Sequence, residues 1–131
     1  VMKKRVLLFL SLLFVWGASL LAQDVPEGVI TAFKKGSSQE LRCFLGDKVD
    51  FLFNSRIVSS EREATLNRLS DFFTENKVNN FSVHHQGKRN ESSFFIGTLT
   101  TTHGNFRVNC FFKMVQNRYI VHQIRIDKTN D

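Results

Sequence analysis

Residues 81–127, FSVHHQGKRNESSFFIGTLTTTHGNFRVNCFFKMVQNRYIVHQIRID, decide the fold of this chain. β-Branched and aromatic residues dominate four runs within this stretch, and short clusters of turn-forming residues separate the runs. The pattern predicts four consecutive strands at residues 81–86, 93–101, 105–115 and 119–127. Because only short turns connect them, the four strands should form one antiparallel sheet.

The turns between these strands decide which side chains face inward. His103-Gly104 suits a two-residue turn, which would place Gly97 opposite Cys110. A three-residue turn before residue 119 would place His122 opposite Phe112. The inner face then carries seven candidate residues for a pocket that holds a small apolar ligand: His85, Phe95, Gly97, Leu99, Cys110, Phe112 and His122.

The opposite, outer face of the predicted sheet is less polar than a solvent-exposed sheet should be. A contiguous apolar patch in the middle of adjacent strands favours association with another protein. We therefore expect this face to bind a protein partner or to form a homodimer. The residues that would form it are Phe94, Ile96, Phe111, Tyr119 and Val121.

The sequence before residue 81 predicts three helices and two short strands. A first helix should end at Gly36, and a second, capped by Ser37 or Ser38, should stop at Gly46. Alternating residues 49–53 and the pair 57–58 predict strands. The pattern Ser60-Glu61-Arg62-Glu63 predicts a capping box that opens a third helix. Its buried face would be Leu66, Leu69, Phe72 and Phe73, and Asn76 would end it.

Residues 1–22 have the layout of a Sec-type signal peptide cleaved after Ala22. Lys3, Lys4 and Arg5 precede an apolar run at residues 6–21, and the chain turns polar after Ala22. The prediction is an exported protein, periplasmic or secreted, with residues 23–131 as a single domain. The alternative is an uncleaved segment that anchors the protein to the membrane.

The charge of the chain gives little reason to expect a nucleic-acid partner. The formal net charge is +6, and the signal segment supplies three of those charges, so residues 23–131 carry +3. Such a modest surplus, without interleaved aromatic residues for base stacking, predicts no nucleic-acid binding.

The order helix, helix, strand, helix and four antiparallel strands resembles the cystatin-like cone of nuclear-transport-factor-2-like domains. Residues 25–127 also resemble an uncharacterised family of small exported proteins from Bacteroidetes. The shared segments are Ala32-Phe33-Lys34-Lys35-Gly36, Phe72-Phe73, His85-Gln86-Gly87, Ile96-Gly97-Thr98-Leu99, Gly104-Asn105-Phe106-Arg107 and Ile124-Arg125-Ile126-Asp127. The resemblance implies an α+β fold in which N-terminal helices pack on a curved antiparallel sheet. It implies no activity, because the fold hosts enzymes, ligand carriers and protein-binding modules.

Cysteines and histidines are the residues that could carry chemistry. Cys43 and Cys110 permit one disulfide in an exported chain, and two buried free thiols are the alternative. His85 and His122 should lie on strands about 14 Å apart, too far for one metal ion. We therefore predict no metal and no cofactor.

The leading hypothesis is an exported, non-catalytic binding module of cystatin-like cone type. Its ligand would be a small apolar molecule in the cone or a protein on the outer face. The alternative is a small enzyme that uses His85 or His122 in the cone cavity as an acid–base group, assisted by Tyr119 or Cys110.

Overall fold

In the computed structural model, which describes residues 25–129, six strands form one sheet in the order β2-β1-β6-β5-β4-β3. Neighbouring strands are antiparallel, except that β1 and β6 are parallel. The strands are β1 (Leu45–Phe53), β2 (Arg56–Ser59), β3 (Val78–Arg89), β4 (Ser92–Thr101), β5 (Gly104–Val115) and β6 (Arg118–Lys128). The four predicted long strands and the two short ones are all present.

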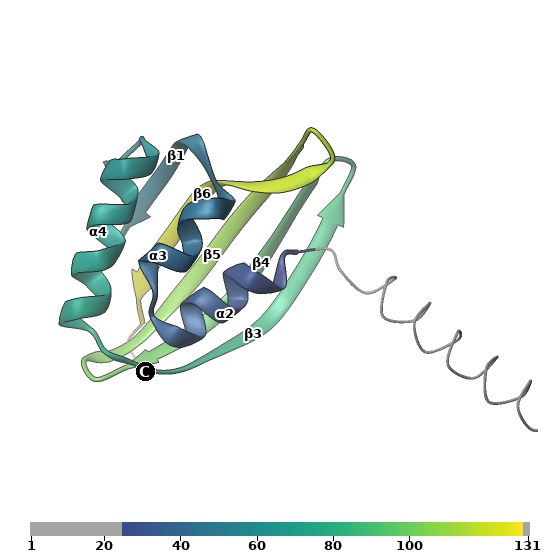
Figure 1. The fold of residues 1–131 in the computed structure, drawn as a ribbon. Coiled ribbons are helices and arrows are strands. Elements are labelled where there is room, and N and C mark those ends of the chain that lie inside the picture. Colours follow the sequence, from purple (N-terminus) through teal and green to yellow (C-terminus); the bar gives the residue numbers. More distant parts are fainter. Residues whose placement is uncertain (1–24, 130–131) are drawn as a thin grey trace, which may run out of the picture.

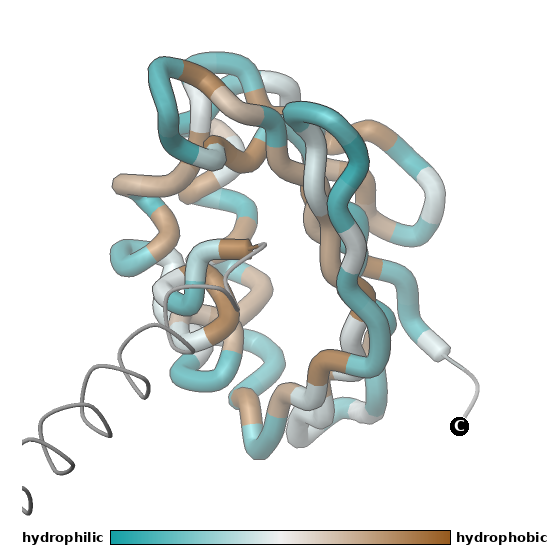
Figure 2. The backbone as a smooth tube through the Cα atoms, turned by 90° about the vertical axis from the view of Figure 1, so that its right-hand side faces the viewer, coloured by the Kyte–Doolittle hydropathy of each residue, from teal (hydrophilic) through white to brown (hydrophobic). Residues whose placement is uncertain are grey.

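The helices lie together on one face of this sheet, as Figure 1 shows. They are α2 (Glu27–Lys35), α3 (Ser38–Leu41), the 3-10 helix η1 (Arg42–Phe44) and α4 (Arg62–Glu75). The view in Figure 2 shows helices and curved sheet as two layers. The predicted α+β cone is therefore confirmed. Within residues 25–129, no helix has the length and apolar character needed to cross a membrane, and the predicted signal peptide lies outside the described residues.

Several predicted helix ends have the expected hydrogen bonds. Gly36 adopts the left-handed conformation with φ of 65°, and its amide donates to the last turn of α2. The Ser37 hydroxyl accepts from the Glu40 amide at 3.3 Å. The Asn76 side-chain amide donates to the Phe72 carbonyl at 3.0 Å and closes α4.

The predicted capping box is wrong. Glu61 is the N-cap residue of α4 and makes no side-chain capping bond. Glu63 instead accepts two hydrogen bonds from the Arg42 guanidinium, at 2.6 and 3.2 Å. The charge of Arg42 thus competes successfully with the backbone amides for this carboxylate.

Phe33 is the centre of an aromatic cluster in the core, where α2 packs over β3 and β4. Its ring has no exposed surface and lies 5.4 Å from the Phe81 ring, 6.1 Å from Phe95 and 6.1 Å from Phe73. One such aromatic pair adds about 0.5–1.5 kcal/mol to the stability beyond the burial of its surface. The three pairs of Phe33 therefore make this cluster a major contributor to the stability of the fold.

The register of the sheet departs from the predicted one in three places. The turn between β4 and β5 is Thr102-His103, so Gly97 lies opposite Val108 instead of Cys110. This shift of two residues leaves every side chain on its predicted face, because strands have a period of two. The other two departures are single-residue bulges, in β3 at His84 and in β6 at His122, and each reverses the faces beyond it.

Candidate functional site

The predicted pocket at the centre of the cone is the packed core. Phe95, Leu99, Cys110 and Phe112 have no exposed surface. A methyl group added to Gly97 would lie 2.8 Å from the ring atom Cζ of Phe81. The Phe81 ring therefore fills the space that the missing side chain of Gly97 would otherwise leave open.

His85 does not lie inside the cone, and the inner-face prediction for it is wrong. The bulge at His84 moves His85 into the position opposite Ile96, on the outer face. There its ring is exposed and lies 5.5 Å from the ring of Phe94. His84, on the same surface, shares a 2.7 Å hydrogen bond with the Thr98 hydroxyl.

The bulge in β6 places Val121 opposite Phe112, the position that was predicted for His122. The turn before β6 has two residues, Gln116 and Asn117, both with positive φ, so Val121 lies opposite Phe112. Val121 has no exposed surface, and Tyr119 packs against the core, so both predictions of outer-face placement are wrong. His122 leaves the inner face and lines a surface pocket that also contains Lys113.

Burial lowers the pKa of His122 below its ordinary value, because the charged imidazolium loses hydration. The positive charge of Lys113 lowers this pKa further, and the carboxylate of Asp50 acts in the opposite direction. The imidazole of His122 is thus held toward its neutral form by its surroundings.

The two cysteines are not joined. Cys43 lies on η1 and is exposed, because the predicted second helix already ends at Leu41. Cys110 is fully buried, and burial raises the pKa of its thiol well above the ordinary value. A buried neutral thiol of this kind is a packing residue. Within residues 25–129, no three His, Cys, Asp or Glu side chains are arranged to hold a metal ion.

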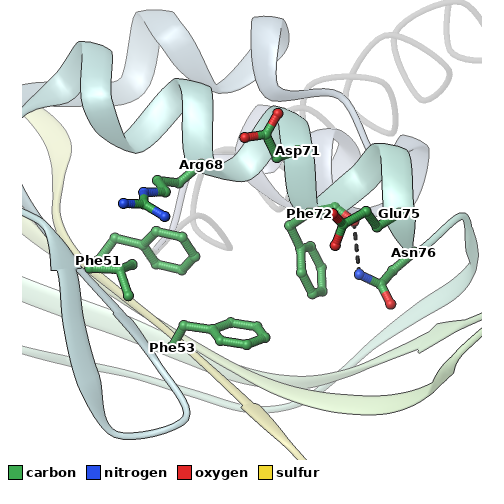
Figure 3. Close-up of a pocket in the computed structure, with 8 residues that line it drawn as sticks. Phe51, Phe53, Arg68, Asp71, Phe72, Glu75 and Asn76 are labelled. Carbon is green, nitrogen blue, oxygen red and sulfur yellow. Dashed lines mark hydrogen bonds between the residues drawn. The ribbon is translucent and has the colours of Figure 1, made fainter.

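A pocket of about 250 Å³ lies between α4 and the β1–β2 hairpin, at the edge of the core (Figure 3). Its apolar walls come from Phe51 and Phe53 of β1, Val58 of β2 and Phe72 of α4. Phe51 and Phe72 are almost fully buried, whereas Phe53 and Val58 keep part of their surface accessible. The ring of Phe53 packs edge-to-face on that of Phe72, with 5.8 Å between their centroids.

Charged residues from α4 form the rim of this pocket. Arg68, Asp71 and Glu75 are exposed and follow one another at helical spacing beside the buried stripe of α4. Figure 3 shows them above the aromatic rings. Such a combination, an apolar interior with a few polar groups at the entrance, is typical of small-molecule sites. We name this site, lined by Phe51, Phe53, Val58, Arg68, Asp71, Phe72, Glu75 and Asn76, the α4 pocket.

Sequence reasoning missed the α4 pocket, although it assigned most of its walls to buried faces. The only available signal was the charged stripe of α4 next to Phe72. That stripe is equally typical of an ordinary solvated helix face. Whether a pocket forms depends on the distance between α4 and the β1–β2 hairpin, which the sequence does not give.

Comparisons with known proteins agree on family and fold. A family model described as a domain of unknown function (DUF4783) matches residues 26–127. The crystal structure of a DUF4783 family protein from Bacteroides ovatus is 59% identical, with a TM-score of 0.81 over 84% of this chain and 100% of that chain. A second crystal structure, of a DUF4783 family protein from Bacteroides fragilis, is 57% identical. Its TM-score is 0.78 over 81% of this chain and 100% of that chain. No protein of curated function matches this chain.

More distant similarity concerns the fold alone. An NTF2-like protein from Cytophaga hutchinsonii is 12% identical and has a TM-score of 0.60 over 79% of this chain and 91% of that chain. The resemblance to an uncharacterised Bacteroidetes family with a nuclear-transport-factor-2-like fold is therefore confirmed.

Proposed function

The chain belongs to the DUF4783 family, a family of unknown function. We propose that it is an exported, non-catalytic binding module. Its ligand is a small apolar molecule, and its site is the α4 pocket. Export is proposed from the signal-like residues 3–22, and an N-terminus at Gln23 in the purified protein would support it.

One observation carries the ligand proposal: the α4 pocket gives solvent access to aromatic side chains that otherwise belong to the core. Phe53 is partly exposed even though its ring packs on Phe72 and lies 6.3 Å from the ring of Phe106. Burying exposed apolar surface releases about 25 cal/mol per Å², so an apolar guest gains most against these rings. The charged rim favours a guest with a polar end that stays at the entrance.

Filling the α4 pocket should abolish binding of a neutral apolar dye such as N-phenyl-1-naphthylamine. We expect Val58→Trp to reduce the dye affinity at least tenfold, because the indole would occupy most of the space of about 250 Å³. Dye fluorescence on titration with the purified protein measures this change. Ile57→Trp is the matched control, since Ile57 is the neighbouring residue but is 63% exposed and does not line the pocket.

Equal dye binding by the Val58→Trp and Ile57→Trp variants would rule out the α4 pocket as the ligand site. Circular dichroism of both variants shows whether the fold is kept. A wild-type protein that binds no neutral apolar dye would also contradict the proposal.

The outer face of the sheet supports a second candidate function, association with a second copy of the chain. Phe94 and Phe111 lie opposite each other on β4 and β5, with 6.4 Å between their centroids, and both are partly exposed. Ile96 continues this patch, and the Oδ1 atom of Asn109 opposite it is buried without a hydrogen-bond donor. An interface across this patch would cover the apolar surface of Phe94, Ile96 and Phe111.

Placing a charge in the patch should separate such a dimer. Phe111→Glu is expected to convert a dimer into a monomer in native mass spectrometry, because the carboxylate would lose its hydration inside the interface. Ile57 lies on β2, which β1 and β6 separate from the strands of the patch, so Ile57→Glu should leave the dimer intact. A wild-type protein that is already monomeric would refute the dimer.

The positions of the histidines give less support to the alternative hypothesis of a histidine enzyme. It required His85 or His122 in a cavity of the cone, and both side chains leave the inner face at a bulge. Of the two assisting groups, Cys110 lies in the packed core, and Tyr119 is partly buried and packs against it.

A further inference from the structure

A second pocket, of about 400 Å³, lies where β1 and β6 separate at one end of the sheet. Leu45 pairs with Val121 and Asp50 pairs with Gln123, so four residues of β1 face only His122 on β6. An irregularity of this size interrupts the ladder of hydrogen bonds and opens the sheet. We name this site the β1–β6 pocket; it is lined by Cys43, Leu45, Gly46, Asp47, Lys48, Arg62, Lys113, Val115, Arg118, Ile120, Val121 and His122.

The charges around the β1–β6 pocket are strongly unbalanced. Four cations line it, and they come from four different elements: Lys48 from β1, Arg62 from α4, Lys113 from β5 and Arg118 from β6. Asp47 is the only carboxylate among the lining residues. Asp50, whose carboxylate acts on His122 of this pocket, adds a second negative charge, so four positive charges face two negative ones. This surplus of positive charge attracts anions.

Asp47 is poorly placed to neutralise this surplus. Its side chain is 93% exposed, and its oxygen lies 3.5 Å from a terminal nitrogen of Arg62, a contact that solvent screens strongly. Among the described residues, no carboxylate lies within ion-pair distance of Lys48, Lys113 or Arg118. Three of the four cations therefore have their charge available for a ligand.

Hydrogen-bond donors at the pocket are also unused or fixed in place. The Nε of Arg62 is buried and has no acceptor in the protein. Arg118 donates from one terminal nitrogen to the Cys43 carbonyl at 2.7 Å, which holds its guanidinium at the wall of the pocket. A buried donor without an acceptor is rare in folded proteins, so a water molecule or a ligand atom is expected to accept from Arg62.

Apolar side chains form the remaining wall. Leu45 and Val121 are buried at the base, and Ile120 and Val115 lie nearer the surface. The volume is larger than a single inorganic ion needs and lies in the range of small-molecule sites. The ligand should therefore combine a compact negative charge with an apolar part.

We infer that the β1–β6 pocket binds a small organic anion, in which a phosphate- or sulfate-type group contacts the cations and an apolar part rests on Leu45 and Ile120. Arg62 and Arg118 supply planar donor groups that suit the oxygens of such a group. Lys48 and Lys113 add charge without fixed geometry. This site is separate from the α4 pocket and shares no lining residue with it.

Phenyl phosphate is the probe, because it joins a doubly charged oxyanion to one aromatic ring. Titration of the isotopically labelled protein should shift the NMR signals of the Gly46 amide and the His122 imidazole, both of which line the pocket. Isothermal calorimetry should give an affinity that weakens with added sodium chloride, since the contact is ionic. Phenol, which has the ring without the charge, should shift neither signal.

Charge removal assigns the binding to these residues. Arg118→Gln and Lys113→Gln should each weaken phenyl phosphate binding roughly tenfold, as expected for one lost charge-assisted hydrogen bond. Arg89→Gln is the matched control, because Arg89 ends β3 and does not line the pocket. Absence of binding, or equal binding by the wild type and Arg118→Gln, would overturn the inference. Inorganic phosphate that binds as tightly as phenyl phosphate would overturn the part assigned to the apolar wall.

Discussion

Replacing Phe33 with alanine is expected to lower the free energy of unfolding by about 3–5 kcal/mol. Phe33 has no exposed surface, and its ring packs against the rings of Phe73, Phe81 and Phe95. The substitution removes the transfer energy of the phenyl group and leaves a cavity between helix and sheet. Alanine is the better helix former, but this gain in α2 is only about 0.5 kcal/mol and does not offset the loss.

Urea unfolding followed by circular dichroism measures this effect, with Phe94→Ala as the control. Phe94 is also a phenylalanine in an aromatic contact, but it lies on the outer face and is partly exposed. Its truncation should lower the free energy of unfolding by only about 1 kcal/mol, since no closed cavity forms. Similar losses for Phe33→Ala and Phe94→Ala would contradict the central role of Phe33 in the core.

Replacing Gly97 with alanine should have the second largest effect, a loss of about 3 kcal/mol, although only one methyl group is added. The new Cβ would lie 2.6 Å from the Ser82 carbonyl oxygen and 2.8 Å from Cζ of Phe81. The carbonyl belongs to the backbone of the neighbouring strand, and the ring is locked in the core, so neither can move aside. The β3–β4 pairing must distort to admit the methyl group.

Gly87→Ala is the matched control for this prediction. Gly87 also lies in β3–β4 pairing, and its added Cβ would lie 2.6 Å from an atom of the Phe94 ring. That ring is on the outer face with part of its surface exposed, so it can turn away, and the loss should stay below about 1 kcal/mol. Thermal unfolding of both variants makes the comparison. A Gly97→Ala protein as stable as Gly87→Ala would show that the core near Phe81 is loosely packed.

Local sequence signals predicted the elements of this protein well, because each signal acts over a few neighbouring residues. Gly36 ends α2 since it accepts a positive φ without strain, and Asn76 ends α4 with its own side-chain amide. The alternating apolar residues of β4 and β5 predicted the buried Phe95, Leu99, Cys110 and Phe112 correctly. Even the error in the turn at Thr102-His103 left these faces intact, because it shifted the register by two residues.

The candidate sites were predicted much less well, because they depend on where one element stands relative to another. Phe51, Phe53 and Phe72 read as ordinary core residues until the distance between α4 and the β1–β2 hairpin is known. The cations of the β1–β6 pocket are spread from Lys48 to Arg118 along the sequence, and only the fold brings them to one place.

The sequence by itself determined the family, the order of helices and strands and most of the core, because side-chain periodicity and chain-end signals are local. Only the tertiary structure decided which way His85, Val121 and His122 face. A curved sheet needs bulges to bend, and one extra residue reverses every side chain beyond it. The sequence pattern of β3 and β6 fits both the bulged and the regular register, because histidine, valine and isoleucine are acceptable on either face of the sheet. The bulges at His84 and His122 are properties of how β3 and β6 pair with their neighbouring strands, which the local sequence does not specify.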